Sequence, residues 1–121
     1  MEAIKNNPED AKAHFNLGIV YAHKGELDAA AREYEEVLRI EPEHSMAHNN
    51  LGKTFAEKGM LDKAMEKYKA ALRIKPEYAE ARANLGEALS SKGQFNEAIV
   101  EYRKALEINP ENAEVHANLG L

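Results

Sequence analysis

Apolar residues recur along this chain three or four positions apart, the spacing that places side chains on one face of an α-helix. A first stripe of this kind comprises Ala13, Leu17, Val20 and Tyr21. A second comprises Leu27, Ala30, Ala31, Tyr34, Val37 and Leu38. The pattern predicts two amphipathic helices in succession, each with one apolar face.

The whole pattern then repeats at an interval of 34 residues. The interval is marked by Pro8, Pro42, Pro76 and Pro110, by Gly18, Gly52 and Gly86, and by Gly25, Gly59 and Gly93. It defines three full units, 11–44, 45–78 and 79–112, in which twelve columns are identical. Residues 1–10 then correspond to the tail of a preceding repeat helix, and residues 113–121 to a partial helix of a fourth repeat. Agreement in so many columns indicates a repeat protein.

Glycine and proline predict where the helices of a unit end. In the first unit, the first helix is expected to stop at Gly25, because glycine adopts the left-handed conformation of a helix C-terminus. The second helix is expected to begin at a capping Asp28 and to end before Pro42. The equivalent residues are Gly59, Asp62 and Pro76, and then Gly93, Asn96 and Pro110. Because the connection is short, the two helices of a unit are antiparallel, and the fold class is all-α.

Another glycine of each unit lies inside the first helix, where glycine costs about 1 kcal/mol relative to alanine. In the first unit this residue is Gly18. We expect Gly18 to face Ala30 of the partner helix, with Tyr34 and Leu38 on the flanks, so that the two backbones approach closely.

These columns resemble the tetratricopeptide repeat, whose pattern has Leu-Gly, an aromatic residue, alanine, a second aromatic residue and proline. The matching residues are Leu17, Gly18, Tyr21, Ala30, Tyr34 and Pro42; Leu51, Gly52, Phe55, Ala64, Tyr68 and Pro76; and Leu85, Gly86, Leu89, Ala98, Tyr102 and Pro110. The chain departs from the pattern at Leu89 and, where the family has tryptophan, at His14, His48, Arg82 and His116. We expect these histidines to replace tryptophan in packing. The resemblance implies a right-handed superhelical solenoid of antiparallel helix pairs.

Composition excludes several classes of function. The chain of 121 residues has 16 Lys and Arg against 21 Asp and Glu, a net charge of −5 and no cysteine. The negative charge argues against a nucleic-acid partner, whose binding relies on basic side chains. The lack of a long apolar run argues against membrane insertion and a secretory signal. The lack of cysteine fits a reducing, cytoplasmic compartment.

Candidate catalytic and metal sites have simpler structural interpretations. Residues 52–54, Gly-Lys-Thr, imitate the end of a phosphate-binding loop, but Ala47 stands where that motif needs glycine and the segment lies in a helix. His44 and His48 have the spacing of a helical metal pair, yet His44 lies in the turn before the helix. We expect no catalytic residue, no metal site and no cofactor.

In tetratricopeptide arrays the first helices of the units line a concave groove, and the resemblance implies that an extended peptide or a helix binds there. The groove residues implied by the resemblance are Lys12, Phe15, Asn16, Ile19, His23, Met46, Asn49, Asn50, Lys53, Glu57, Glu80, Asn84 and Glu87.

One asparagine of each unit recurs in this set, as Asn16, Asn50 and Asn84. A carboxamide both donates and accepts hydrogen bonds, so such a ladder can pair with the backbone of an extended peptide. The arrangement resembles the asparagine-lined repeat region of O-linked N-acetylglucosamine transferases. The alternative is that these amides bond to neighbouring helices or to water.

The two ends of the groove differ in character. Phe15, Ile19 and Met46 form an apolar anchor, whereas Glu80 and Glu87 are acidic, so a ligand with an apolar anchor and a basic end suits it. Alternatively, a preceding repeat covers Phe15 and Ile19. The repeat domains that clamp acidic chaperone tails carry lysine at the positions of Phe15 and Glu80, which predicts that this chain does not bind such tails.

We therefore predict a non-catalytic scaffold that binds a protein or peptide in the groove. One alternative is a structural element that forms a homo-oligomer through its uncapped repeat ends, where Leu119 and Leu121 are apolar. Another is the substrate-recruiting part of a larger enzyme.

Overall fold

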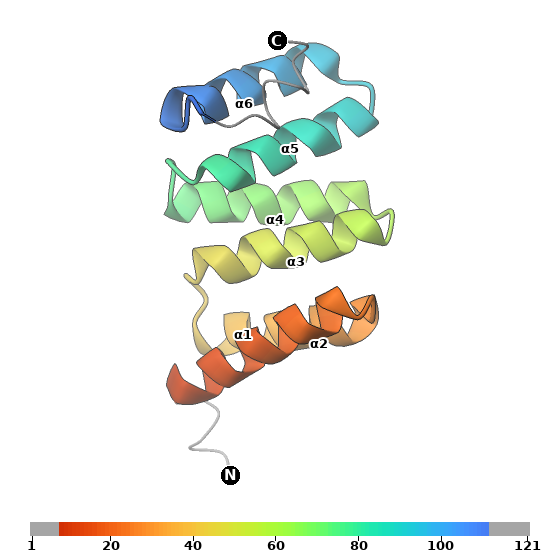
Figure 1. Cartoon of the computed structure of the whole chain (residues 1–121), viewed down its shortest axis with the longest axis vertical. Helices are drawn as coiled ribbons and strands as arrows, with labels where there is room; N and C mark the ends of the chain where they lie inside the picture. The colour runs from red at the N-terminus through yellow and green to blue at the C-terminus, as the bar shows by residue number, and fades with distance from the viewer. Residues whose placement is uncertain (1–7, 112–121) are drawn as a thin grey trace.

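The computed structural model describes residues 8–111, which form helices joined by short turns (Figure 1). In chain order the helices are α1 (Pro8–His23), α2 (Leu27–Ile40), α3 (Ser45–Glu57), α4 (Leu61–Ile74), α5 (Ala79–Ser91) and α6 (Phe95–Ile108). No strand occurs within these described residues, so the predicted all-α class is confirmed. α1 begins at Pro8, three residues before the unit 11–44, whereas α3 and α5 begin at the first residue of their units. Residues 8–10, which we assigned to a preceding repeat, therefore belong to α1, and Pro8 lies in its first turn, where the missing N–H is not needed. The predicted partial helix at 113–121 lies outside the described residues.

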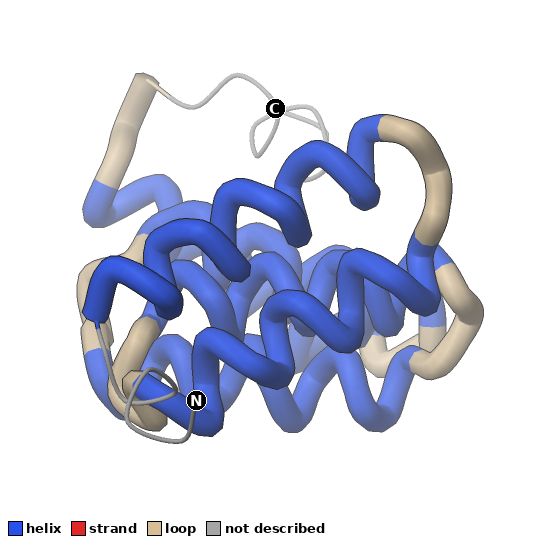
Figure 2. The backbone as a smooth tube through the Cα atoms, turned by 90° about the horizontal axis from the view of Figure 1, so that it is seen from below, coloured by secondary structure: helices blue, strands red, loops and turns tan. Residues whose placement is uncertain are grey.

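The helices stack in chain order along one axis (Figure 1). The strongest pairings join α1 to α2, α3 to α4 and α5 to α6, and weaker ones join α2 to α3 and α4 to α5. α3 also contacts α5 directly. The turns gather at the two ends of the helices (Figure 2), as expected for a stack of antiparallel pairs. The fold is therefore the helical repeat solenoid that the sequence predicts.

Glycine ends each first helix as predicted. The φ angles of Gly25, Gly59 and Gly93 are 79°, 80° and 81°, a region that glycine enters without strain. After α1, the Gly25 N–H donates to the Ala22 carbonyl at 3.0 Å, and the Glu26 N–H donates to the Tyr21 carbonyl at 2.9 Å. These two bonds form a Schellman motif, which satisfies the last carbonyls of α1.

The predicted caps of the second helices are wrong. α2 begins at Leu27, directly after the glycine turn, so Asp28 lies inside the first helical turn. Glu26 holds the cap position without a side-chain capping bond, and its carbonyl already accepts the Ala30 N–H at 3.0 Å. Asp28 instead pairs with Lys58, which ties α2 to the end of α3. In the later units, Asp62 pairs with Lys92, and Asn96 lies in the first turn of α6.

Proline closes the second helices as predicted. α2, α4 and α6 end at Ile40, Ile74 and Ile108, two residues before a proline. The residue between is not helical; Glu41, for example, has φ −129° and ψ 85°. A residue before proline is disfavoured in the helical conformation, so the chain turns here toward the next helix.

The glycines inside the first helices accommodate tyrosine rings, not the alanine that we expected to face them. A Cβ atom at Gly18 would lie 2.6 Å from Cε1 of Tyr34, and one at Gly52 would lie 2.6 Å from Cε1 of Tyr68. At Gly52 the Ala64 carbonyl oxygen is also close, at 3.0 Å. The close approach was predicted correctly, but its main partner is an aromatic ring that occupies the space of the absent side chain.

The buried core runs through the stack but leaves its first layer open. Leu51 of α3 and Leu85 of α5 are 0% and 4% exposed. Leu17, at the equivalent position of α1, is 44% exposed, and Val20 beside it is 54% exposed. α3 and α5 pack against the preceding second helices, α2 and α4, and α1 has no such helix within the described residues. The predicted apolar stripe of α1 is therefore only partly buried.

His48 and Arg82, at the repeat position where the family has tryptophan, form hydrogen bonds to the turns between helix pairs. His48 Nε2 lies 2.9 Å from the Pro42 carbonyl oxygen, and Arg82 Nη2 donates to the Pro76 carbonyl at 3.1 Å. His48 is 8% exposed, and burial holds its pKa below the usual value, which the bond to Pro42 partly opposes. In the same turn, the His44 ring accepts the Ala47 N–H at 3.1 Å and so caps α3.

Candidate functional site

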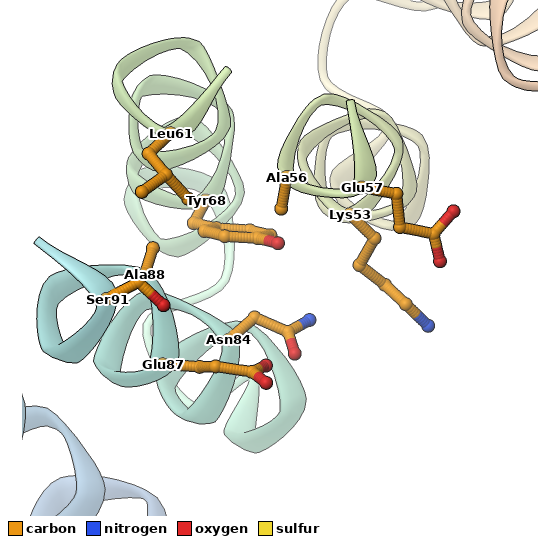
Figure 3. Close-up of a pocket in the computed structure, with 9 residues that line it drawn as sticks. All are labelled: Lys53, Ala56, Glu57, Leu61, Tyr68, Asn84, Glu87, Ala88 and Ser91. Atoms are coloured by element: carbon orange, nitrogen blue, oxygen red, sulfur yellow. The ribbon is translucent and has the colours of Figure 1, made fainter. Parts of the chain in front are cut away.

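Two neighbouring cavities lie along the first helices of the stack. The larger, the α3–α5 pocket, has a volume of about 290 Å³ and is lined by Lys53, Ala56, Glu57, Leu61, Tyr68, Asn84, Glu87, Ala88 and Ser91 (Figure 3). The smaller, the α1–α3 pocket, has a volume of about 160 Å³ and is lined by Ile19, Ala22, His23, Tyr34, Asn50, Lys53, Thr54 and Glu57.

The two pockets are copies of one arrangement, displaced by 34 residues. Each lining residue of the α1–α3 pocket has its equivalent in the larger pocket, and these equivalents are Lys53, Ala56, Glu57, Tyr68, Asn84, Glu87, Ala88 and Ser91. Lys53 and Glu57 line both pockets. A linear ligand along the first helices would therefore meet the same backbone geometry twice, with different side chains.

A buried tyrosine lies at the back of each pocket. Tyr34 and Tyr68 are 2% and 3% exposed, and burial raises the pKa of both phenols above the usual value. A hydrogen bond from Asn50 opposes the shift in the pKa of Tyr34, whereas Glu87 and Glu57 raise the pKa of Tyr68 further. The hydroxyl of Tyr68 points into the α3–α5 pocket (Figure 3).

Asn84 does not repeat the contact that Asn50 makes with its tyrosine. Its Nδ2 donates to Oδ1 of Asn49 at 3.0 Å, across the contact between α5 and α3. Asn49 is 0% exposed, so the prediction that it faces the groove is wrong: its side chain lies between the two helices. The first and third units have Phe15 and Ala83 at this position, and neither can hold an amide in the same way.

Acidic side chains dominate the α3–α5 pocket. Glu57 and Glu87 line it, and neither forms an ion pair with another residue of the described segment 8–111. Lys53 also lines the pocket, but its Nζ lies 3.2 Å from Oε2 of Glu80. The charge of Lys53 is thus shared with Glu80, and two carboxylates of the pocket remain without a counter-charge.

The pockets bring together part of the predicted groove. The predicted residues that line them are Ile19, His23, Asn50, Lys53, Glu57, Asn84 and Glu87. Lys12 and Asn16 are exposed on α1, outside both pockets.

The three residues of the predicted apolar anchor differ in their surroundings. The Phe15 ring packs against Tyr34 and His44, with centroids 5.9 and 4.9 Å apart, and Met46 is 49% exposed. Of the three anchor residues, Ile19 lines the α1–α3 pocket, whereas Phe15 and Met46 do not. Phe15 packs on Tyr34, which lines the same pocket as Ile19, and an anchor formed by all three residues stays a prediction.

Sequence reasoning did not assign Tyr34, Thr54, Leu61, Tyr68 or Ala88 to the groove, although these residues line the pockets. The tyrosines were assigned to the core, and their burial agrees with that role. Tyrosine differs from phenylalanine in needing a hydrogen-bond partner or water for its hydroxyl. All three units have tyrosine and not phenylalanine at this repeat position, which indicates that it lies at the edge of the core.

A stack of helix pairs with repeated pockets along one side defines an α-helical repeat scaffold for protein interactions. A tetratricopeptide repeat model matches residues 11–44, and a second model, of the TPR repeat, matches residues 52–91 and 88–121. The chain belongs to the tetratricopeptide repeat family.

Solved structures share this fold. The Arabidopsis OM64 TPR domain is similar with a TM-score of 0.91 and 20% identity, covering 93% of each chain. The first TPR of Spaghetti (RPAP3), bound to the HSP90 peptide SRMEEVD, has a TM-score of 0.90 and 21% identity over 93% of this chain and 89% of that one. An O-GlcNAc transferase mutant of Thermobaculum terrenum has a TM-score of 0.88 and 28% identity, covering 93% of this chain and 22% of the transferase.

None of the curated proteins compared with this chain matches its sequence. None of the helices in residues 8–111 has the length and apolar character needed to cross a membrane. The family and the fold establish a protein-interaction scaffold, and the chemistry of the pockets bears on what it binds.

Proposed function

We propose that the groove along α1, α3 and α5 binds an extended segment of a partner protein. The observation that carries this proposal is the repetition of one pocket at the 34-residue interval. An extended peptide also presents its backbone groups at regular intervals, so neighbouring repeats can bind successive parts of it in the same way.

The asparagines of the two pockets supply sequence-independent contacts. The Asn50 amide bonds to Tyr34, and the Asn84 amide donates to Asn49. A carboxamide has two donors and an acceptor with two lone pairs, so each keeps hydrogen-bonding capacity for a ligand. Their bonds within the protein hold the amides in place before binding, which reduces the entropic cost of binding.

Affinity selection from a random peptide display library tests this proposal. The wild type is compared with Asn50→Ala/Asn84→Ala and with Asn96→Ala, a control on the exposed start of α6. We expect the wild type and the control to enrich related extended peptides and the double variant to lose them, while all three retain helical circular dichroism. Enrichment that survives in the double variant would sink the proposal.

A second candidate, head-to-tail association with a second copy, is favoured by the apolar ends of the stack. Within the chain, α4 supplies Leu61 to the pocket beside α5. Phe95, at the equivalent position of α6, is 62% exposed, while Leu17 and Val20 of α1 are exposed at the other end. In such a dimer, α6 of one copy would pack against α1 of the second copy, as α4 packs against α5 within the chain.

A further inference from the structure

We propose that the α3–α5 pocket receives a lysine or arginine side chain of the bound peptide, with the Tyr68 hydroxyl as hydrogen-bond acceptor and Glu57 and Glu87 as counter-charges. This inference rests on the proposed function of the groove and names the kind of residue that the groove selects.

The Tyr68 hydroxyl is the first observation that indicates a ligand. Tyr68 is only 3% exposed, and its hydroxyl points into the pocket between α3 and α5 (Figure 3). Nothing in residues 8–111 forms a hydrogen bond with it, whereas Tyr34 has Asn50 as its partner. Asn84, the residue equivalent to Asn50, is held by Asn49 instead. An N–H donor from a ligand would satisfy the hydroxyl that Asn84 leaves unpaired.

The charge of the pocket determines which donor is favoured. Glu57 from α3 and Glu87 from α5 lie on opposite sides of the opening (Figure 3). The one lysine of the lining, Lys53, is bonded to Glu80. Two free carboxylates around one opening attract a cation and repel an acidic side chain. An ammonium or guanidinium group can donate to both the carboxylates and the phenol.

The walls of the pocket fit the stem of such a side chain. Leu61, Ala56, Ala88 and the ring of Tyr68 provide apolar surface behind the carboxylates. Lysine and arginine bury their methylene stems against apolar surface while the charged end stays at a polar opening. Apolar walls and an acidic opening therefore match one cationic side chain.

The α1–α3 pocket lacks this combination although its backbone arrangement is the same. His23 and Lys53 stand where the larger pocket has Glu57 and Glu87. Its tyrosine already has Asn50 as a partner. The cation is thus expected in the α3–α5 pocket, which fixes the position of the peptide along the groove.

NMR titration with two small probes tests the inference without a known peptide. The probes are N-acetyl-arginine N-methylamide and its citrulline analogue, which has nearly the same shape and no charge. We expect the arginine probe to shift the backbone resonances around Glu57, Asn84 and Glu87, with an affinity at least about fivefold higher than that of citrulline. Added salt weakens this preference, because the carboxylates are at the surface.

Matched variants locate the effect. Glu57→Gln/Glu87→Gln is expected to reduce arginine binding to the level of citrulline, and Tyr68→Phe to weaken it by removing one oxygen. Glu35→Gln/Glu66→Gln removes the same charge from exposed positions on α2 and α4 and is expected to leave binding unchanged. Equal binding of the two probes, or equal loss in both double variants, overturns the inference.

The library selection and the probe titration together distinguish failure of the cationic pocket from failure of the proposed groove function. If selected peptides depend on Asn50 and Asn84 but the probes bind equally, the groove function stands and the cationic pocket fails. If the selection enriches no peptide and the arginine probe still binds preferentially, the pocket stands and the extended-peptide proposal fails.

Discussion

At the scale of single residues, one substitution between repeats changes the chemistry of a repeated pocket. Phe15, Asn49 and Ala83 occupy one column, and Asn49 alone of the three carries an amide. Its bond to Asn84 leaves the hydroxyl of Tyr68 without the partner that Tyr34 has in Asn50. Repeats with the same backbone can therefore differ in what they bind.

The two tyrosines respond differently to loss of the hydroxyl. Tyr34→Phe removes a hydrogen bond from Asn50 and should lower the free energy of unfolding by about 1 kcal/mol. Tyr68→Phe removes a hydroxyl that has no partner and should lower it by less. Urea unfolding of both variants gives the comparison, and a larger loss for Tyr68→Phe would contradict the assignment of the two hydroxyls.

His48 makes stability depend on pH in a predictable direction. Burial lowers its pKa in the folded state, so below about pH 6.5 the unfolded chain takes up a proton that the folded chain resists. This contribution is complete above pH 6.5 and is lost as the pH falls from there toward the lowered pKa. The difference in free energy of unfolding between wild type and His48→Gln should therefore shrink between pH 7.5 and 5.5.

Asn96→Ala, at an exposed position of α6, is the control for that series because it removes no titratable group. Its unfolding should show the same pH dependence as that of the wild type. If the difference in free energy of unfolding between wild type and His48→Gln stays constant from pH 7.5 to 5.5, burial does not lower the pKa of His48.

At the scale of helices, glycine does two separate tasks in each repeat. Gly25 and its equivalents supply the left-handed residue that ends a first helix. Gly18, Gly52 and Gly86 instead leave space for a tyrosine ring of the partner helix. The second task fixes the distance between the helices of a pair, and with it the position of the tyrosine hydroxyl in the pocket.

Alanine at these internal glycines should destabilise the fold, although alanine favours helix formation. The new Cβ would lie 2.6 Å from Tyr68 at Gly52 but 2.9 Å from Tyr102 at Gly86. We expect Gly52→Ala to lower the free energy of unfolding by roughly 1 to 3 kcal/mol and Gly86→Ala by less. Thermal unfolding shows which of the two variants is less stable. Stabilisation by Gly52→Ala would contradict the prediction, because it would mean that the Tyr68 ring can move away from the new methyl group.

The repeat pattern was sufficient to predict the helices and their C-termini, because glycine and proline act on the backbone locally. It was insufficient for the caps, because the Schellman turn leads directly into the next helix and Asp28 then meets Lys58 of another repeat. Likewise, helical periodicity places Asn49 beside Asn50 but cannot show that Asn49 bonds to Asn84. Contacts between repeats depend on distances across the stack, which spacing along the chain does not contain.

At the scale of the whole molecule, the stack formed by residues 8–111 combines a polar groove with apolar surface on its first and last described helices. Leu17 and Val20 are exposed at one end, and Phe95 and Ile99, 62% and 39% exposed, lie on α6 at the other. The two features support different associations, one with a peptide and one with a second copy. They can be separated by experiment because they use different residues.

Self-association should depend on concentration and on these apolar residues. If the ends associate, the mass measured by light scattering rises with concentration, and Leu17→Ser/Val20→Ser keeps it at that of the monomer. Asn50→Ala/Asn84→Ala serves as the control, because the groove amides take no part in this contact. A monomeric mass at all concentrations would exclude the head-to-tail candidate.

The most direct test of the groove as the working surface is the affinity of a selected peptide, measured by calorimetry. We expect Asn50→Ala/Asn84→Ala to weaken binding by more than about 1 kcal/mol while the helical content stays nearly unchanged. The acidic peptide SRMEEVD, bound in the Spaghetti structure, should show no measurable binding to this chain, because Glu57 and Glu87 repel it. Unchanged affinity in the asparagine variant, with a folded protein, would contradict the account.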